Sequence, residues 1–510
     1  MRPTASNEVF ATGNGCAMCH AAADTALAMR SPTGDDVSPH GLWQATMMAN
    51  SFRDPYWRAT VAKEIARRPE QAGPLQALCV RCHAPMAHHT AAFAGQPTAS
   101  VAELAKDPLA VDGVSCTVCH KIEAKNLGTA ASFSGGASIG RDRAIYGPFA
   151  DPAQGPMQMH SGYEPQQGLH VQTSAHCATC HTLATHHAPG SAPFPEQTPY
   201  MEWRNSQFSD ENGRTGHSRS CQECHMPDMG TVKIARNPMG RDFLIPPRPF
   251  RAHAFVGGNA FMLDMLGKHR DELGVPAPAT ALARMATATR AQLADRTAVV
   301  TVTPPARTGD TLEFAVRVEN LTGHKFPTGY PARRAWLHVQ VRAGNQLVFE
   351  SGAFDKAGRL TQVADELAIP HVTRIESPAD VMVWELVAAD AAGRPTTDLA
   401  AMAVRQKDNR LLPKGWQRSG PHAESTAPLG TGRDVDFVAG SDTVAFAVPL
   451  PKETPTGVRI LAWLHYQTIP PAWVESLRSV DAEECRTFVR LYDAADKTPE
   501  TIGIGQAFEK

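Results

Sequence analysis

Five short stretches of the chain place two thiols and one imidazole at a fixed spacing. Each follows the frame Cys-x-x-Cys-His, and the frame reads in turn CAMCH, CVRCH, CTVCH, CATCH and CQECH. On a helical turn, positions i, i+3 and i+4 share one face, so both sulfurs and the ring nitrogen can address a single flat ligand. This spacing is the attachment signature of c-type haem, in which the thiols form thioethers with the porphyrin and the histidine ligates the iron.

Two rival chemistries of Cys-x-x-Cys pairs fit less well. Zinc ribbons combine the pairs two by two, and a trailing histidine has no place in a four-sulfur site. Redox disulfides would leave the five histidines unexplained. The frames therefore predict five c-type haems, attached through Cys16, Cys19, Cys79, Cys82, Cys116, Cys119, Cys177, Cys180, Cys221 and Cys224, with His20, His83, His120, His181 and His225 as the proximal iron ligands.

The composition limits the class of protein. The 510 residues carry a formal net charge of −2, which favours neither nucleic-acid binding nor a polybasic membrane surface. No apolar run approaches the roughly 18 residues of a membrane span. Because c-type haem is attached outside the bacterial cytoplasm, we expect a periplasmic or extracellular protein whose leader is not part of this numbering. Cys485, the odd thiol, is interpreted as a buried small residue, with an intermolecular or regulatory bond as the alternative.

The distribution of residues along the chain predicts several domains. Ten of the eleven cysteines and 15 of the 21 histidines precede residue 254, and so little protein per cofactor implies that haems form the core there. Helices are expected at 259–273 and 279–295. After residue 296 the apolar pattern has period two, typical of strands. The predicted fold is a haem-packed region of loops and short helices (1–258), a helical connector (259–295), an all-β antiparallel sandwich (296–475) and a C-terminal extension (476–510).

Seven stretches carry a resemblance to a known family. They read WQATMMANSFRDPYW, GVSCTVCH, FPEQTPYMEW, SCQECHMP, HAFVGGNAFM, GHKFPTGYPARRAWLHVQV and KDNRLLPKGW. Together they resemble bacterial pentahaem and other multihaem c-type cytochromes that have a cytochrome c-554-like haem region and a C-terminal β-sandwich. The resemblance covers nearly the whole chain and implies electron transfer through closely packed haems. It implies no agreed substrate.

The ligands on the far side of each iron are less certain than the proximal ones. His253 is the first candidate, because the small residues that follow it would let the backbone lie against a porphyrin. His160 comes next, and His324, on a turn fixed by Gly and Pro, is either a turn cap or a ligand. The remaining candidates are His217 and, around the fourth frame, His170, His176, His186 and His187.

One distal ligand is predicted to be a methionine. In the family that the chain resembles, a Trp-x-x-Ser-x-His stretch often delivers a distal histidine. The comparable runs here, WQATMM and WRNSQF, place Met48 and Phe208 at the histidine position. Methionine can ligate iron and phenylalanine cannot, so Met48 is a candidate, with core packing as the alternative and His40 as the imidazole that could replace it.

The function predicted from these observations is that of an electron carrier rather than an enzyme. Five haems would form a periplasmic or extracellular conduit whose partners are redox proteins or other cytochromes, and possible self-assembly is a further expectation. One alternative is a pentahaem reductase of a small nitrogen or sulfur compound, similar to nitrite reductase; all five frames ending in His argue against it. The other is a filament or surface-complex subunit docked by the β-domain. No cofactor is expected in the second half, where Cys485 stands alone and the histidines are scattered.

We expect the mature protein to carry five covalent haems, because each of the five frames is complete. The mass of the denatured protein should exceed that of the polypeptide by five haem masses, once processing is allowed for. Four or fewer haems in fully matured protein would contradict the prediction.

Overall fold

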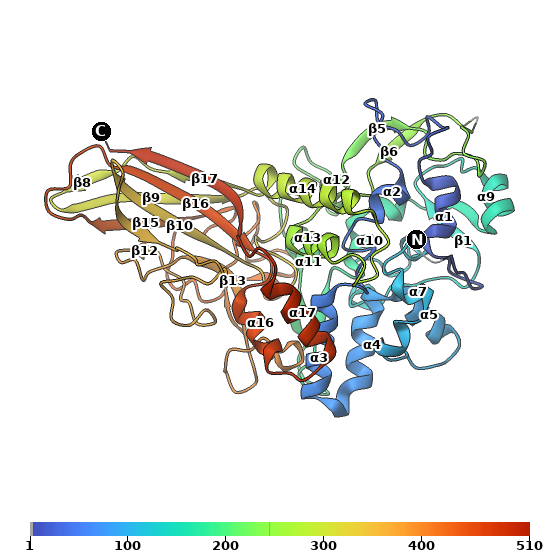
Figure 1. Cartoon of the computed structure of the whole chain (residues 1–510), viewed down its shortest axis with the longest axis horizontal. Coiled ribbons are helices and arrows are strands. Elements are labelled where there is room, and N and C mark those ends of the chain that lie inside the picture. The colour runs from blue at the N-terminus through green and yellow to red at the C-terminus, as the bar shows by residue number, and fades with distance from the viewer. Residues whose placement is uncertain (1–3, 244, 510) are drawn as a thin grey trace. The chain divides into compact units, whose positions relative to one another are not determined.

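The computed structural model describes residues 4–243 and 245–509, which fall into two compact units (Figure 1). The CxxCH unit comprises Met1–His181, Arg219–Thr289 and Val480–Ala494. The β-sheet unit comprises Thr182–Ser218, Arg290–Ser479 and Ala495–Lys510. Segments 182–218 and 480–494 thus belong to units other than those in which the sequence pattern places them.

The CxxCH unit is built from short helices, as the sequence predicts for the segments around the frames. Each of the five frames lies on or at the end of a helix. The helices are α1 (Gly13–His20), α2 (Pro39–Trp43), α3 (Pro55–Arg67), α4 (Ala72–His83), α5 (Pro85–Phe93), α6 (Val101–Leu104), α7 (Pro108–Val111), α8 (Cys116–Cys119), α9 (Gln154–Ser161), α10 (Ser174–Ala178), α12 (Cys221–His225), α13 (Ala260–Lys268), α14 (Ala279–Arg296, which continues into the β-sheet unit) and α17 (Glu483–Asp493), with 3-10 turns at Pro69–Gln71, Ala130–Ser132 and Leu169–Gln172.

Local chemistry fixes where these helices begin. At α3 the Asp54 carboxylate accepts hydrogen bonds from the main-chain N–H groups of Tyr56 and Trp57, and Pro55 occupies the first helical position. At α12, Ser220 and Glu223 form a reciprocal capping box directly before the fifth frame. The starts of α3 and of the fifth-frame helix α12 are therefore set by residues close to them in the sequence.

Small sheets accompany the helices, which the sequence analysis did not predict. In the CxxCH unit, β1 (Ala144–Gly147) pairs in parallel with β2 (Glu164–Gln167), and β5 (Asp228–Val232) pairs antiparallel with β6 (Arg248–Arg251). Each has only two strands, and the segments carry no clear period-two pattern. Each pair joins two loop segments by main-chain hydrogen bonds.

Helix α17 joins the CxxCH unit from far along the chain. It lies against α3, where the Cys485 thiol donates to the carbonyl of Ala59 at 3.3 Å. The ring of Tyr56 lies 5.0 Å from that of Phe488. Cys485 is 1% exposed, and burial raises the pKa of its thiol to about 11. The structure thus buries the thiol, as the first interpretation of Cys485 expected.

The β-sheet unit contains two large sheets, both visible as long arrows in Figure 1. One has the strand order β14-β13-β10-β16-β17, with β11 paired to β10; the other has the order β12-β15-β9-β7, with β8 paired to β9. The strands are β7 (Ala298–Val302), β8 (Ala306–Thr308), β9 (Thr311–Asn320), β10 (Arg334–Ala343), β11 (Gln346–Ser351), β12 (Arg374–Ile375), β13 (Val383–Ala389), β14 (Val404–Asp408), β15 (Ser441–Pro449), β16 (Arg459–Gln467) and β17 (Glu500–Phe508).

Further elements complete the β-sheet unit. Buried side chains from both sheets, among them Val316 and Phe446 on one and Leu337 and Leu464 on the other, meet in one apolar cluster. The remaining elements are the pair β3 (Leu183–Thr185) and β4 (Phe194–Gln197), the helices α11 (Pro199–Arg204), α15 (Ala423–Thr426) and α16 (Pro471–Arg478), and a 3-10 turn at Leu399–Ala401.

Most strands agree with the period-two pattern, and the antiparallel prediction fails at one place. The period-two stretches after residue 296 form β7, β9, β10, β11, β13, β15 and β16, and the two expected helices correspond to α13 and α14. However, β12 runs parallel to β15. The connection between the two paired strands runs from Ile375 to Ser441 through β13 and β14 of the other sheet, and its length permits the parallel direction that a tight hairpin cannot give. In addition, β17, within the predicted extension, pairs with β16.

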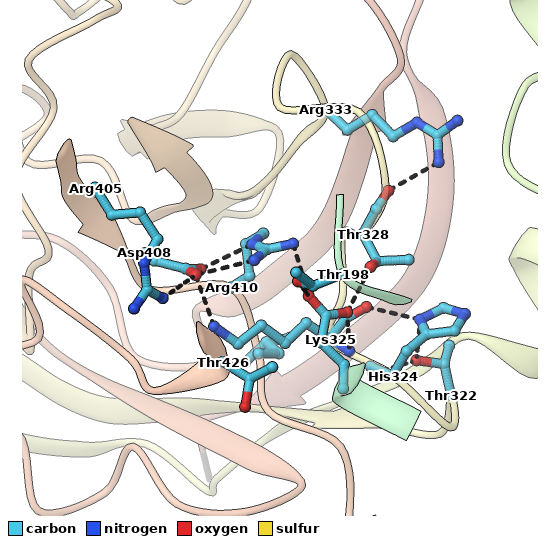
Figure 2. A network of polar contacts seen from close by, with 12 residues as sticks. Thr198, Thr322, His324, Lys325, Thr328, Arg333, Arg405, Asp408, Arg410 and Thr426 are labelled. Atoms are coloured by element: carbon cyan, nitrogen blue, oxygen red, sulfur yellow. Dashed lines mark hydrogen bonds and ion pairs between the residues drawn. The ribbon is translucent and has the colours of Figure 1, made fainter. Parts of the chain in front are cut away.

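A buried network of charges ties the loops of the β-sheet unit together (Figure 2). Lys325 Nζ lies 2.7 Å from an Asp408 carboxylate oxygen, and both side chains are fully buried. Arg410 contacts Asp408 at 2.8 Å and Glu202 of α11 at 3.0 Å. The hydroxyl of Thr328 donates to Glu202 at 2.5 Å. This network brings together three of the stretches behind the family resemblance, namely GHKFPTG, KDNR and FPEQTPYMEW.

The network sets the protonation state of its carboxylates. Burial by itself would raise the pKa of Asp408, but the charges of Arg410 and Lys325 hold it well below its usual range. The stabilisation from this depressed pKa is present above the unfolded-state value of about 4 and is lost as the pH falls toward the folded-state value. The β-sheet unit should therefore lose stability in acid.

Replacing Asp408 with Asn should lower the free energy of unfolding of the β-sheet unit by about 3–5 kcal/mol, because it leaves Lys325 and Arg410 buried without their counter-charge. The loss is measured by urea unfolding followed by far-UV circular dichroism. Glu475→Gln is the matched control, since it breaks the surface pair with Arg359 and should cost less than about 1 kcal/mol. Equal effects of the two substitutions would contradict the prediction.

Candidate functional site

All five CxxCH frames lie within the CxxCH unit, and their histidines are held by the main chain of distant segments. The Nδ1 atoms of four of them lie 2.5–3.0 Å from carbonyl oxygens. Such a bond fixes the ring plane and places the Nδ1 proton, so that Nε2 carries the lone pair a metal needs. The four pairs are His20 with Ile234, His83 with Ser51, His120 with Tyr146, and His225 with Val256.

Burial keeps these imidazoles neutral. It lowers the pKa of His83 to about 4, and it also lowers the pKa values of His20, His120 and His225. A charged imidazole cannot bind a metal through either nitrogen. At neutral pH the four rings are therefore in the ligating form.

The cysteines of different frames lie close together. Contacts between thiols join Cys16 to Cys116, Cys82 to Cys180 and Cys177 to Cys221. Cys119 also acts electrostatically on Cys180. The fourth frame is thus adjacent to the second, third and fifth, and the first frame is adjacent to the third.

Glycine permits one of these close approaches. Gly135, at φ +76°, donates from its main-chain N–H to the carbonyl of Thr179 in the fourth frame at 2.7 Å. A Cβ atom there would meet Arg81 Cβ, in the second frame, at 2.7 Å. Both the backbone conformation and the contact exclude a side chain. The loop around Gly135 therefore fits between the two frames only with glycine at this position.

Several buried polar atoms beside the frames have no hydrogen-bond partner in the described part of the chain. Gln222 lies inside the fifth frame, and Ser115 and His176 directly precede the third and fourth. Such atoms normally find a partner, and a polar group on an attached porphyrin would supply one. Together with the thiols and the fixed imidazoles, they fit covalent haem. The atoms are Ser115 Oγ, His176 Nδ1 and Gln222 Oε1, and Trp57 Nε1 near the second frame is a fourth.

Of the predicted distal ligands, His253 lies beside a frame histidine. Its ring centroid is 6.3 Å from that of His120, with 20° between the ring planes. Its Nδ1 lies 3.1 Å from the carbonyl oxygen of Arg251, and burial lowers its pKa to about 3. Both rings therefore have Nδ1 bound to the main chain and Nε2 as the coordinating nitrogen, which suits two ligands of one iron.

Other candidates around the third and fourth frames occupy different environments. His176 is buried, and burial lowers its pKa to about 3, with further lowering by His120 and His170. His170 has Nε2 2.7 Å from the carbonyl oxygen of Ile122 and lies 6.1 Å from His176. The structure thus places both histidines near the third frame.

His40 lies on α2, and Met48 follows that helix. Met48 is partly buried, and its carbonyl accepts from the N–H of Val114, two residues before the third frame. His40 is buried, with its ring 5.8 Å from that of Trp43. Thioether ligation by Met48 stays a prediction.

The remaining predicted ligands are exposed or belong to the β-sheet unit. His160 is exposed on α9. His217, His186, His187 and His324 belong to the β-sheet unit, and His217 is exposed. His324 Nδ1 lies 2.8 Å from the carbonyl oxygen of Lys325 and 3.3 Å from Thr322, at the margin of the buried charge network (Figure 2). Its turn is thus tied to that network.

The sequence analysis overlooked His88 and His89 of α5. Burial lowers the pKa of His89 to about 4, and its ring lies 6.4 Å from that of Phe10. His88 Nδ1 lies 2.9 Å from the Thr98 hydroxyl. Their position, five and six residues after the ligand of the second frame, was an available signal. Either could be an iron ligand.

The β-sheet unit also gathers His371, Asp434 and Asp442, whose ligand atoms lie within 4.8 Å of one another. The Asn409 amide accepts from Glu385 N–H and donates to the Val383 carbonyl, so its NH₂ faces His371 Nδ1 at 3.0 Å. His371 therefore carries its proton on Nε2 and donates it to Asp434 at 2.8 Å. A ring in this state is a hydrogen-bond donor, and we assign no metal to the group.

No protein-family model and no curated protein matches the sequence. Among solved structures, the chain is similar to a penta-heme cytochrome c552 from Thermochromatium tepidum. The similarity covers 98% of each chain, with a TM-score of 0.54 and 16% sequence identity. At this identity the likeness shows the fold, which the two chains share along nearly their whole length.

Replacing His253 with Gly should convert one low-spin iron to high spin, because the iron of the third frame would lose its second imidazole. Electron paramagnetic resonance of the oxidised protein measures the change, and added imidazole should reverse it. His160→Gly, at an exposed position, is the control and should leave the spectrum unchanged. An unchanged spectrum for His253→Gly with all haems attached would remove His253 from the ligand set.

Proposed function

We propose that the chain is a multihaem c-type cytochrome that carries electrons through five covalently bound haems. The observation that supports this most directly is the contact between thiols of different frames, since sulfurs so close would attach porphyrins at short range. Haem itself supplies the redox chemistry when bound. The five frames would hold it through Cys16, Cys19, Cys79, Cys82, Cys116, Cys119, Cys177, Cys180, Cys221 and Cys224 and through the histidine that ends each frame.

The protein's own residues would attach, orient and shield the haems. The main-chain carbonyls of Ile234, Ser51, Tyr146 and Val256 hold the Nδ1 protons of the frame histidines. A ligand held by such a bond is a better electron donor to the metal. The arrangement of the frames makes the fourth a junction to the second, third and fifth, and the first frame is reached through the third.

An electron carrier is favoured over a reductase. A reductase needs an iron with an open position for its substrate, whereas a carrier closes every iron with a second ligand. The CxxCH unit offers His253, His176, His170, His88, His89, His40 and Met48 for that purpose. These are enough for five irons, and the carrier needs no substrate pocket.

The expected location and partners follow from the same proposal. We infer a periplasmic or extracellular protein that exchanges electrons with other redox proteins, because c-type haem is attached outside the cytoplasm. Among the described residues, no helix combines the length and apolarity needed to cross a membrane. The likeness to cytochrome c-554 rests on the resemblance of the sequence, and docking of a filament or surface complex by the β-sheet unit stays an alternative function.

The number of five-coordinate irons tests the proposal. We expect the oxidised, haem-loaded protein to be fully low spin, and to bind neither nitrite nor hydroxylamine in an optical titration. A high-spin iron that binds either compound, and that turns it over with a chemical reductant, would instead establish the reductase. Absence of covalent haem would refute both functions.

A further inference from the structure

The histidine of the second frame makes three contacts with Ser51, which precedes α3, and with Trp57 in the first turn of α3. Its Nδ1 lies 3.0 Å from the Ser51 carbonyl oxygen. The Ser51 hydroxyl donates back to the His83 carbonyl at 2.9 Å. The indole of Trp57 stacks on the imidazole, with 4.4 Å between the ring centroids and 7° between the planes.

The position of Trp57 is itself strongly determined. The Asp54 carboxylate caps α3 and accepts from the Trp57 N–H at 3.2 Å. The indole is 8% exposed and lies in an apolar cluster with Phe52, Val61 and Val80, the last of which is on the helix of the second frame. Neither ring can turn without disturbing this packing, so the stack fixes the plane of the His83 ring.

We propose that Trp57 is a positioning residue for the second haem, holding the plane of the His83 imidazole and favouring the oxidised state of the iron it ligates. Oxidation of the iron draws electron density from the ligating imidazole, which becomes more positive. The face of an indole attracts positive charge more strongly than any other aromatic ring in proteins. The indole would therefore stabilise the oxidised form and lower the potential of this haem.

This inference rests on the proposed function, because it requires a haem on the second frame. It also predicts where the second haem stands in the order of reduction potentials. The second haem would lie at the low end of the potentials and pass its electron readily to the fourth, whose Cys180 contacts Cys82. A low potential next to a junction directs electrons toward the junction.

The test is a redox titration of the haem-loaded full-length protein with Trp57→Leu and Trp57→Phe. In Trp57→Leu the potential of one haem should rise while the other four stay unchanged, and one low-spin paramagnetic resonance signal should change its g values because the imidazole plane is freed. Trp57→Phe keeps an aromatic face and should give a smaller shift in the same direction. Tyr56→Leu is the matched control, since it removes a buried ring from the same helix where that ring packs on Phe488.

The outcomes separate this inference from the proposed function. Fewer than five haems in the wild-type protein would contradict the proposed function. Five haems in Trp57→Leu with every potential and every signal as in the wild type would overturn only the role of Trp57. A shift of equal size in Tyr56→Leu would also overturn it, by showing that general loosening of α3 is the cause. If Trp57→Leu does not accumulate, the Trp57→Phe variant decides by the same criteria.

Discussion

The hydrogen bonds from the frame histidines to main-chain carbonyls are the constraint on which the CxxCH unit depends. Each frame lies on or at the end of a short helix, so the spacing of its two thiols and its imidazole is set locally. The plane of the imidazole, however, is set by a carbonyl far away in the sequence, such as Ile234 for His20 or Val256 for His225. Ser51 and Tyr146 lie between frames, whereas Ile234 and Val256 follow the fifth frame. Both the loops between the frames and the segment after the last frame are therefore required to return these carbonyls to the ligands.

Features that depend on neighbouring residues could be predicted from the sequence, and features that depend on distant residues could not. The frames follow from residue type and spacing alone, and β9 follows from a strict alternation of buried side chains, which β10 and β16 keep over only part of their length. The parallel pairing of β12 with β15 could not be predicted, because β12 has only two residues and is separated from β15 by the long stretch of chain that holds β13 and β14. Pairing of β17 was missed because two glycines interrupt the pattern of its strand.

The distal ligands could not be predicted with the same certainty as the frames, because they depend on contacts between residues that are distant in the sequence. His253 was chosen for the small residues after it, and its relation to His120 became visible only when residues 120 and 253 came together in the fold. His88 and His89 were overlooked although they directly follow a frame. A sequence does not distinguish a ligating histidine on a loop from a non-ligating one, because the difference lies in the orientation of the ring and in its burial.

The stretches behind the family resemblance have two different physical roles. Those in the first half build the frames and the start of α3, where WQATMMANSFRDPYW supplies Ser51 and Trp57 to the second frame. GHKFPTG and KDNR in the second half, together with FPEQTPYMEW, instead build the buried network of Lys325, Asp408, Arg410 and Glu202. A buried charge without its partner is costly, so these residues are interdependent even without contact to a cofactor. A shared motif in a haem protein therefore need not mark a haem ligand, and the contacts of His324 and Lys325 in the β-sheet unit account for their motif through packing and charge.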